Sequence, residues 1–344
     1  MESALVDGSS ESRYFLQLCP AFQIFTLRPT FPKGRPNHNT AMKIAIVGSG
    51  SIGLYYGAKL AVSGQNVQFL MRSGLDEARR EGIRVLSPGG DLHLPKPSVH
   101  AHTPGIGVCD LVLIALKTTQ NAAAATLLPP LVGPGTVILT LQNGLGNEEF
   151  LAGHFGEERI LGGLCFVCLT RESPACVRHF DHGALSIGEF RRAPLPRTHA
   201  IVEAFANSGL QARVVEDLIQ ERWRKLVWNI PFNGLSVAEG GLTVDRILAD
   251  PHLEARCRAL MLETLAIAKS RGHSLPPEIA DRQIDRTRTM GPYQPSTMVD
   301  YLAGRELEIE SIWGEPLRQA KSAGLAVPNL EHLHQRLLAI QPST

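Results

Sequence analysis

A lysine and two asparagines recur four residues apart in the second half of the chain. They are Lys225, Asn229 and Asn233, in the segment Trp223-Arg-Lys-Leu-Val-Trp-Asn-Ile-Pro-Phe-Asn233. On a helix this spacing places the three polar side chains on one stripe. A lysine ammonium in such a stripe can donate a proton to a substrate. One reaction that needs a donor of this kind is the reduction of a ketone by hydride, because it puts negative charge on the ketone oxygen. A lone helical lysine is usually solvated, but one in register with two asparagines and flanked by tryptophans is a candidate for that donor.

A glycine-rich turn supplies a second chemical signal. The turn, Gly48-Ser49-Gly50-Ser51-Ile52-Gly53, directly follows the apolar run 43–47 and opens a helical pattern. Gly48 permits a tight turn, Gly50 lets a pyrophosphate approach the backbone, and Gly53 allows close packing of helix on strand. The free N–H groups and positive dipole at the helix start then bind the phosphates. These six residues predict a dinucleotide site.

The end of the second strand indicates which dinucleotide binds. A carboxylate there would bond the ribose 2′-hydroxyl of NAD, but the sequence has Met71-Arg72-Ser73 and no acid before Asp76. The guanidinium of Arg72 matches the oxygens of a 2′-phosphate. We therefore predict NADPH.

Two more polar loops follow predicted strands. Lys117 ends the strand 110–116, and Gln142-Asn143-Gly144 follows the strand 136–141. Ligands bind at the carboxyl ends of such strands. Lys117 can meet a phosphate or a substrate acid, and the Asn143 amide offers a donor and an acceptor near the nicotinamide.

Strands that alternate with helices must position these residues. Predicted strands 43–47, 66–71, 110–116 and 136–141 are separated by helical stretches at 54–63 and 120–128. This order predicts an α/β Rossmann domain with a doubly wound, mostly parallel sheet. Further strands are expected over 160–215, with a hairpin at Asp181-His182-Gly183.

After residue 216 the pattern becomes helical, and it predicts an all-α C-terminal domain. Helices are expected over 218–229, 252–271 and 298–323, and Pro231 should kink or end the first. The chain thus divides into a Rossmann domain at 42–215 and a helical substrate and catalytic domain at 216–340.

Composition excludes several classes of protein. The net charge of +1 and the lack of a basic run with aromatics argue against a nucleic-acid partner. No apolar stretch reaches the roughly 18–20 residues that a membrane span needs. The pair Cys165 and Cys168 lacks a second pair to complete a zinc site, so no metal is predicted and the thiols are read as free.

Residues 1–41 differ from the rest of the chain. They lack periodicity and are rich in turn formers, and neither a secretory signal nor an organelle transit peptide fits them. We expect an unstructured extension that results from an upstream start, with Met42 as the original first residue, on a cytoplasmic enzyme. The sequence leaves a homodimer open.

Taken together, these motifs resemble the ketopantoate reductase (2-dehydropantoate 2-reductase) family. The resemblance covers about residues 42–338 and rests on motifs in their order along the chain: the glycine turn, Leu116-Lys117, Gln142-Asn-Gly144, Trp223-Arg-Lys-Leu226 with Asn229 and Asn233, Tyr293-Gln-Pro-Ser296, Gly304-Arg305, Glu308-Ile-Glu310 and Val327-Pro-Asn329.

The resemblance implies NADPH-dependent reduction of 2-dehydropantoate to pantoate in a cleft between the two domains. It implies that Lys225 protonates the carbonyl oxygen and that Glu308 bonds the developing hydroxyl. Ser296 would bind the substrate carboxylate, Asn229 and Asn233 the substrate oxygens. Lys117 and Asn143 would lie where cofactor and substrate meet. Without the resemblance, nothing in the sequence favours Glu308 over its charged neighbours.

The chain departs from the family pattern in three places. It has Ile312-Trp313-Gly314 where Ile-Asn-Gly is common and Ser296-Thr-Met-Val-Asp300 where Ser-Met-Leu-Gln-Asp is usual, and Gly240-Gly-Leu-Thr243 supplies no asparagine beyond Asn233. Two alternatives therefore stay open. One is a reductase of another small 2-oxo acid that uses the same Lys225 chemistry, and the other is an NADPH-binding regulator without catalysis.

Overall fold

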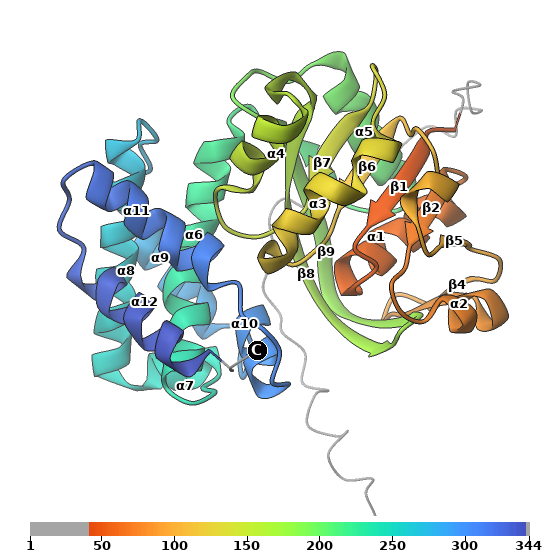
Figure 1. Cartoon of the computed structure of the whole chain (residues 1–344). Helices are drawn as coiled ribbons and strands as arrows, with labels where there is room; N and C mark the ends of the chain where they lie inside the picture. The colour runs from red at the N-terminus through yellow and green to blue at the C-terminus, as the bar shows by residue number, and fades with distance from the viewer. Residues whose placement is uncertain (1–40, 342–344) are drawn as a thin grey trace, which may run out of the picture.

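The computed structural model describes residues 41–341, so the expectation for the N-terminal extension falls almost entirely outside the described residues. A sheet lobe and a helical lobe lie side by side (Figure 1). No helix within residues 41–341 is long and apolar enough to cross a membrane.

The sheet lobe is built on one sheet of ten strands in the order β4-β3-β9-β8-β7-β6-β1-β2-β5, with β10 paired to β9. Its strands are β1 (Lys43–Val47), β2 (Asn66–Leu70), β3 (Ile83–Leu86), β4 (Leu92–Leu94), β5 (Ser98–His100), β6 (Leu111–Ile114), β7 (Val137–Thr140), β8 (Ile160–Ser173), β9 (Cys176–Glu189) and β10 (Ala212–Val214). The pairs β3–β4 and β8–β9 are antiparallel and the others are parallel. The predicted mostly parallel sheet is confirmed.

Helices cover both faces of this sheet, as a doubly wound fold requires. Alternate residues of β1 enter different cores, because successive strand side chains point to opposite faces. The helices of this lobe are α1 (Ser51–Val62), α2 (Leu75–Glu81), α3 (Asn121–Leu127), α4 (Asn147–Phe155) and α5 (Pro196–Asn207). Ile44 and Ile46 pack with α1 and α5, whereas Ala45 and Val47 pack with α3 and α4.

The predicted hairpin at residues 181–183 is wrong. The chain turns at Pro174–Ala175, and residues 181–183 lie inside β9, where the pairing with β8 shifts register. His182 and Gly183 have φ values of 65° and 118°, so the Asp-His-Gly sequence makes a β-bulge. Bulges and tight turns both need residues with positive φ, which explains the error. The stretch 160–215 also contains the helix α5, which the strand expectation omitted.

The C-terminal lobe is helical, as predicted, around a core that includes Trp223 and Trp313. Its helices are α6 (Leu218–Ala238), α7 (Val244–Ala249), α8 (Pro251–Ser270), α9 (Ile279–Arg288), α10 (Ser296–Leu302), the π-helical turn η6 (Glu310–Gly314), α11 (Glu315–Ser322) and α12 (Pro328–Ile340).

Two helical predictions need correction. The helix α6 does not end near Pro231 but continues to Ala238. A proline inside a helix costs about 3 kcal/mol, and the second half of α6 is buried throughout, so packing of its apolar side chains offsets that cost. The expected helix over 298–323 is broken between Leu302 and Glu310, where Gly304 takes a φ of 63°.

Candidate active site

The glycine turn between β1 and α1 has the shape that a bound pyrophosphate needs. Gly48 has a φ of 104°, and a Cβ there would lie 2.5 Å from Leu116 N. A Cβ on Gly53 would overlap the carbonyl oxygen of Gly48. A Cβ on Gly50 would meet nothing within 4 Å, and no side chain caps the start of α1. The backbone at Gly50 is therefore open and its helix-terminal N–H groups are available to phosphate.

The rest of the turn and Arg72 extend this site toward β2. Ser51 and Ile52 form the first turn of α1, and Ser49 Oγ donates to Leu70 O over 2.8 Å, which ties the turn to the end of β2. Arg72 follows β2 with an exposed side chain. Among the described residues no carboxylate pairs with Arg72, so its guanidinium is available to a phosphate.

Lys225 lies on α6 and reaches across to the sheet lobe. Its Nζ donates to Asn143 Oδ1 at 2.8 Å and to Cys165 O at 2.9 Å, and it lies 5.4 Å from the centre of the Phe166 ring. Burial, reinforced by the positive charge of Arg222, lowers the pKa of Lys225 from 10.5 to about 8. A lysine with this pKa is a competent proton donor at neutral pH.

The polar stripe continues along α6 from Lys225. Asn229 and Asn233 are 7% and 2% exposed, on a helix whose buried side chains are mostly apolar. Asn233 Oδ1 accepts from Thr297 N at 3.1 Å and from Ser296 Oγ at 3.4 Å. The structure thus brings Ser296, at the start of α10, to the far end of the stripe.

Lys117 and Glu308 meet across the two lobes. Lys117 Nζ pairs with Asp300 and lies 3.5 Å from Glu308 Oε2, and Glu308 Oε1 accepts from Thr118 N at 2.8 Å. Burial alone would lower the pKa of Lys117, but the carboxylates of Glu308 and Asp300 outweigh it and raise that pKa. Glu308 therefore contacts Lys117 and Thr118 directly, and it acts on Lys225 only through its charge, which opposes the fall in the pKa of Lys225.

Sequence reasoning missed two features of this region. One is Asp300, whose signal was its place four residues after Ser296, one helical turn away. The other is the ion pair of Arg222 with Glu148, which is buried between the lobes. A charged residue within the apolar face of a predicted helix is the signal that could have revealed Arg222.

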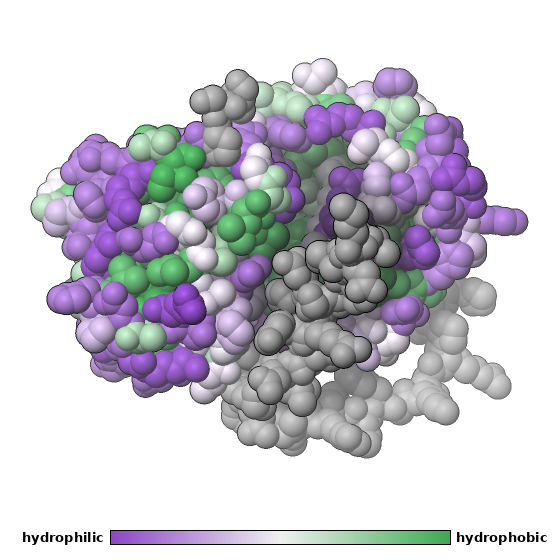
Figure 2. Space-filling model, turned by 90° about the horizontal axis from the view of Figure 1, so that it is seen from below, coloured by the Kyte–Doolittle hydropathy of each residue, from purple (hydrophilic) through white to green (hydrophobic). Residues whose placement is uncertain are grey.

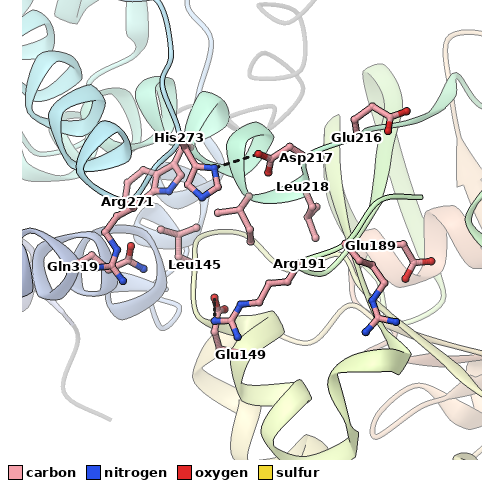
Figure 3. Close-up of a pocket in the computed structure, with 13 residues that line it drawn as sticks. Leu145, Glu149, Glu189, Arg191, Glu216, Asp217, Leu218, Arg271, His273 and Gln319 are labelled. Carbon is pink, nitrogen blue, oxygen red and sulfur yellow. Dashed lines mark ion pairs between the residues drawn. The ribbon is translucent and has the colours of Figure 1, made fainter. Parts of the chain in front are cut away.

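The surface is hollowed between the two lobes when the molecule is viewed from below (Figure 2). A separate cavity of about 450 Å³ lies beside the start of α6, between residues such as Glu149, Arg191 and His273 (Figure 3). None of the predicted cofactor or substrate residues lines that cavity. The glycine turn, the stripe on α6 and the Lys117 cluster therefore define the candidate site.

A Rossmann-type sheet with a turn open to phosphate, joined to a second lobe whose desolvated lysine contacts the sheet lobe, defines a dinucleotide-dependent oxidoreductase. Comparison with known proteins specifies it further. The family described as ketopantoate reductase PanE/ApbA matches residues 44–192, and its C-terminal counterpart matches residues 217–341. The chain belongs to the ketopantoate reductase family, as the motifs predicted.

Relatives in sequence and structure agree with this assignment. The chain is 39% identical over 300 residues to a 2-dehydropantoate 2-reductase of Nostoc sp., covering 86% of this chain and 94% of the relative. It resembles the crystal structure of 2-dehydropantoate 2-reductase from Geobacter metallireducens with a TM-score of 0.84 and 42% identity, over 87% of this chain and 99% of that one. For the enzyme from Methylococcus capsulatus the TM-score is 0.82 at 32% identity, over 88% and 98%.

Proposed function

We propose that this protein reduces 2-dehydropantoate to pantoate with NADPH, a step of pantothenate biosynthesis, in the cleft between its lobes. The observation that carries the proposal is the ammonium of Lys225, which is desolvated on α6 and held by Asn143 and Cys165 of the sheet lobe. The names of the similar proteins, 2-dehydropantoate 2-reductase, support the substrate.

The residues of the glycine turn fit a bound dinucleotide. Gly48, Ser49, Gly50, Ser51, Ile52 and Gly53 would hold its pyrophosphate, because the backbone at Gly50 is open. Arg72 would pair with the 2′-phosphate, and Lys117 and Asn143 would lie near the nicotinamide. NADPH supplies the hydride that reduces the substrate carbon.

Lys225 supplies the proton. A lysine ammonium has three N–H donors, and two of them are used by Asn143 Oδ1 and Cys165 O. The third is left for the ketone oxygen of the substrate. As hydride adds to C2, that oxygen takes the proton and becomes a hydroxyl, and Lys225 becomes a neutral amine that solvent reprotonates.

The stripe on α6 and the start of α10 orient the substrate acid. The Asn233 carbonyl is engaged by Thr297 and Ser296, so its NH₂ group is left to donate to substrate. We assign Ser296 to the carboxylate, to which its hydroxyl would donate in place of Asn233 Oδ1, and Asn229 with Asn233 to the other oxygens. Glu308 would bond the new hydroxyl on turning from Thr118.

A reductase of another small 2-oxo acid is the second candidate. The Gly240–Gly241 stretch supports it, because it supplies no asparagine side chain beyond Asn233 to contact the substrate. Trp313 does not support it, because this departure from the family pattern is fully buried in the core of the helical lobe, where its indole donates to Ile230 O at 2.9 Å.

A panel of small 2-oxo acids, with NADPH absorbance followed over time, separates the two candidates. The proposal expects 2-dehydropantoate to give the highest kcat/KM. No turnover of that acid would refute the proposed substrate.

Three further assignments accompany the function. We propose that the enzyme is cytoplasmic. We also propose that its domains span 42–215 and 216–340, and limited proteolysis can test that boundary. Sedimentation of the purified protein would decide between a monomer and the homodimer that the sequence leaves open. The regulator alternative predicts NADPH binding without turnover, and the substrate panel tests it as well.

A further inference from the structure

A buried ion pair joins the two lobes beside the candidate site. Arg222 on α6 is 2% exposed, and Glu148 on α4 is 1% exposed. Arg222 Nε donates to Glu148 Oε1 at 3.0 Å, and its Nη2 donates to the same oxygen. Gly162 of strand β8 lies against this ion pair. A Cβ at that position would overlap Glu148 Oε1 and lie 3.0 Å from Arg222 Nη2, so a larger residue would disturb the pair.

Stability alone does not account for this pair. Removing two charges from water costs several kcal/mol per ion. Replacing a buried ion pair by apolar side chains of similar volume often leaves the stability of a protein unchanged or increases it. The pair is therefore better explained by what it holds in place.

The third contact of Arg222 shows what that is. Its Nη1 donates to Gln142 O at 2.7 Å, one residue before Asn143, which accepts from Lys225. Arg222 precedes Lys225 by nearly one turn of the same helix. A rigid guanidinium thus fixes α6 against the loop whose next side chain holds the Lys225 ammonium.

The sheet lobe holds the same loop from its other side. Asn147 Nδ2 donates to Asn143 O at 2.9 Å, and Asn121 Nδ2 donates to Asn147 Oδ1 at 2.9 Å. Gln142 Nε2 donates to Asn121 Oδ1 at 2.6 Å. The backbone carbonyls of Gln142 and Asn143 both accept hydrogen bonds, so the loop is held in place. A small movement of α6 relative to this loop would therefore change the distance between Lys225 Nζ and Asn143 Oδ1.

We propose that Arg222 and Glu148 are positioning residues for proton transfer by Lys225: together they hold α6 in register with the Gln142–Asn143 loop. The inference rests on the proposed role of Lys225 as proton donor. The fixed charge of Arg222 has a second effect, because it adds to burial in lowering the pKa of Lys225.

The test replaces the pair by apolar side chains of similar length, in the double variant Arg222→Met with Glu148→Met. The matched control is Arg197→Met with Glu189→Met, which removes another ion pair with a buried carboxylate, within the sheet lobe. Melting temperature, NADPH affinity and the pH profile of kcat are measured for each, with 2-dehydropantoate as substrate.

We expect the Arg222/Glu148 double variant to fold, to bind NADPH with unchanged affinity, and to lose roughly ten- to a hundredfold in kcat, as for misplacement of a catalytic group. Its kcat should begin to fall at a higher pH, because Arg222, which lowers the pKa of Lys225, is removed, and Glu148 is not among the groups that shift that pKa. The control variant should keep the wild-type kcat and the wild-type pH profile of kcat. A folded double variant with wild-type kcat would overturn the inference.

A conservative variant covers failure of the double variant to fold. Arg222→Lys keeps the charge but cannot contact Glu148 and Gln142 O together through a fork. It should lose kcat while its alkaline limb stays in place, and a wild-type kcat would overturn the inference. Lys225→Ala separates the two hypotheses: if that variant keeps wild-type turnover, the proposed role of Lys225 as proton donor fails, whereas if it is inactive and the Arg222 variants have wild-type kcat, only the positioning role fails.

Discussion

Raising the pH should switch off reduction through one group, Lys225. Its pKa falls from 10.5 to about 8, first through burial on α6 and then through the charge of Arg222. The fall corresponds to about 3 kcal/mol of lost preference for the charged form, at about 1.4 kcal/mol for each tenfold change. Only the ammonium can protonate the ketone, so kcat should be level below pH 8 and fall tenfold per pH unit above it.

The assay is the pH dependence of kcat for reduction at saturating NADPH and substrate. Oxidation of the product needs the neutral amine, so the reverse kcat should rise with pH through the same value. Lys225→Ala should bind NADPH normally and lose roughly 10²- to 10⁴-fold in kcat, the usual contribution of a general acid. Exposed Lys269 is the control, and its alanine variant should change neither profile.

A kcat for reduction that stays level beyond pH 9.5, or a Lys225→Ala variant with the wild-type rate, would refute this reasoning. In the first case Lys225 would be as solvated as a surface lysine, or chemistry would not limit turnover. A solvent isotope effect on kcat distinguishes these, because a rate-limiting proton transfer is slowed in D₂O.

Four further variants test the cofactor site and the core. Arg72→Asp should weaken NADPH by roughly ten- to a hundredfold relative to NADH in fluorescence titrations, since it removes a charge-assisted bond of about 1.5–3 kcal/mol. Gly53→Ala should lower the free energy of unfolding by about 1–3 kcal/mol, because its Cβ would overlap Gly48 O. Gly50→Ala should leave the free energy of unfolding unchanged, because there is space for a Cβ, and yet it should weaken the binding of NADPH. Trp313→Ala should cost about 3–5 kcal/mol in urea unfolding with KM unchanged, because Trp313 lies in the core.

Each of these predictions has a contrary outcome. Equal losses of NADPH and NADH would mean that Arg72 does not read the 2′-phosphate. A Gly53→Ala variant as stable as Gly50→Ala would show that the turn relaxes around the added methyl group. A raised KM in Trp313→Ala would place the Ile312-Trp313-Gly314 departure in substrate binding after all.

Local signals made the sheet lobe predictable. In β1, β6 and β7 short runs of apolar residues are buried on both faces, and the glycine turn has a spacing that few other structures need. The long hairpin of β8 and β9 was harder to place. A bulge and a turn both need positive φ, and only the pairing across fourteen-residue strands distinguishes them at His182 and Gly183.

The helical lobe shows where local rules fail. Pro231 is a strong local signal for the end of a helix, but α6 is the central helix of its core and continues through it. The cost of one missing hydrogen bond is small beside the apolar area that the second half of α6 buries. That area depends on partners far along the chain, such as Trp313, so the sequence near Pro231 could not reveal it.

The sequence by itself determined the dinucleotide turn, the mostly parallel sheet and the lysine–asparagine stripe, because each depends on residues close together along the chain. Only the tertiary structure decided what surrounds Lys225. Its partners Asn143 and Cys165 are 82 and 60 residues away, and the pair of Arg222 with Glu148 spans 74. Desolvation and charge act through space, so the lowered pKa from which we infer that Lys225 donates the proton arises only when the two lobes meet.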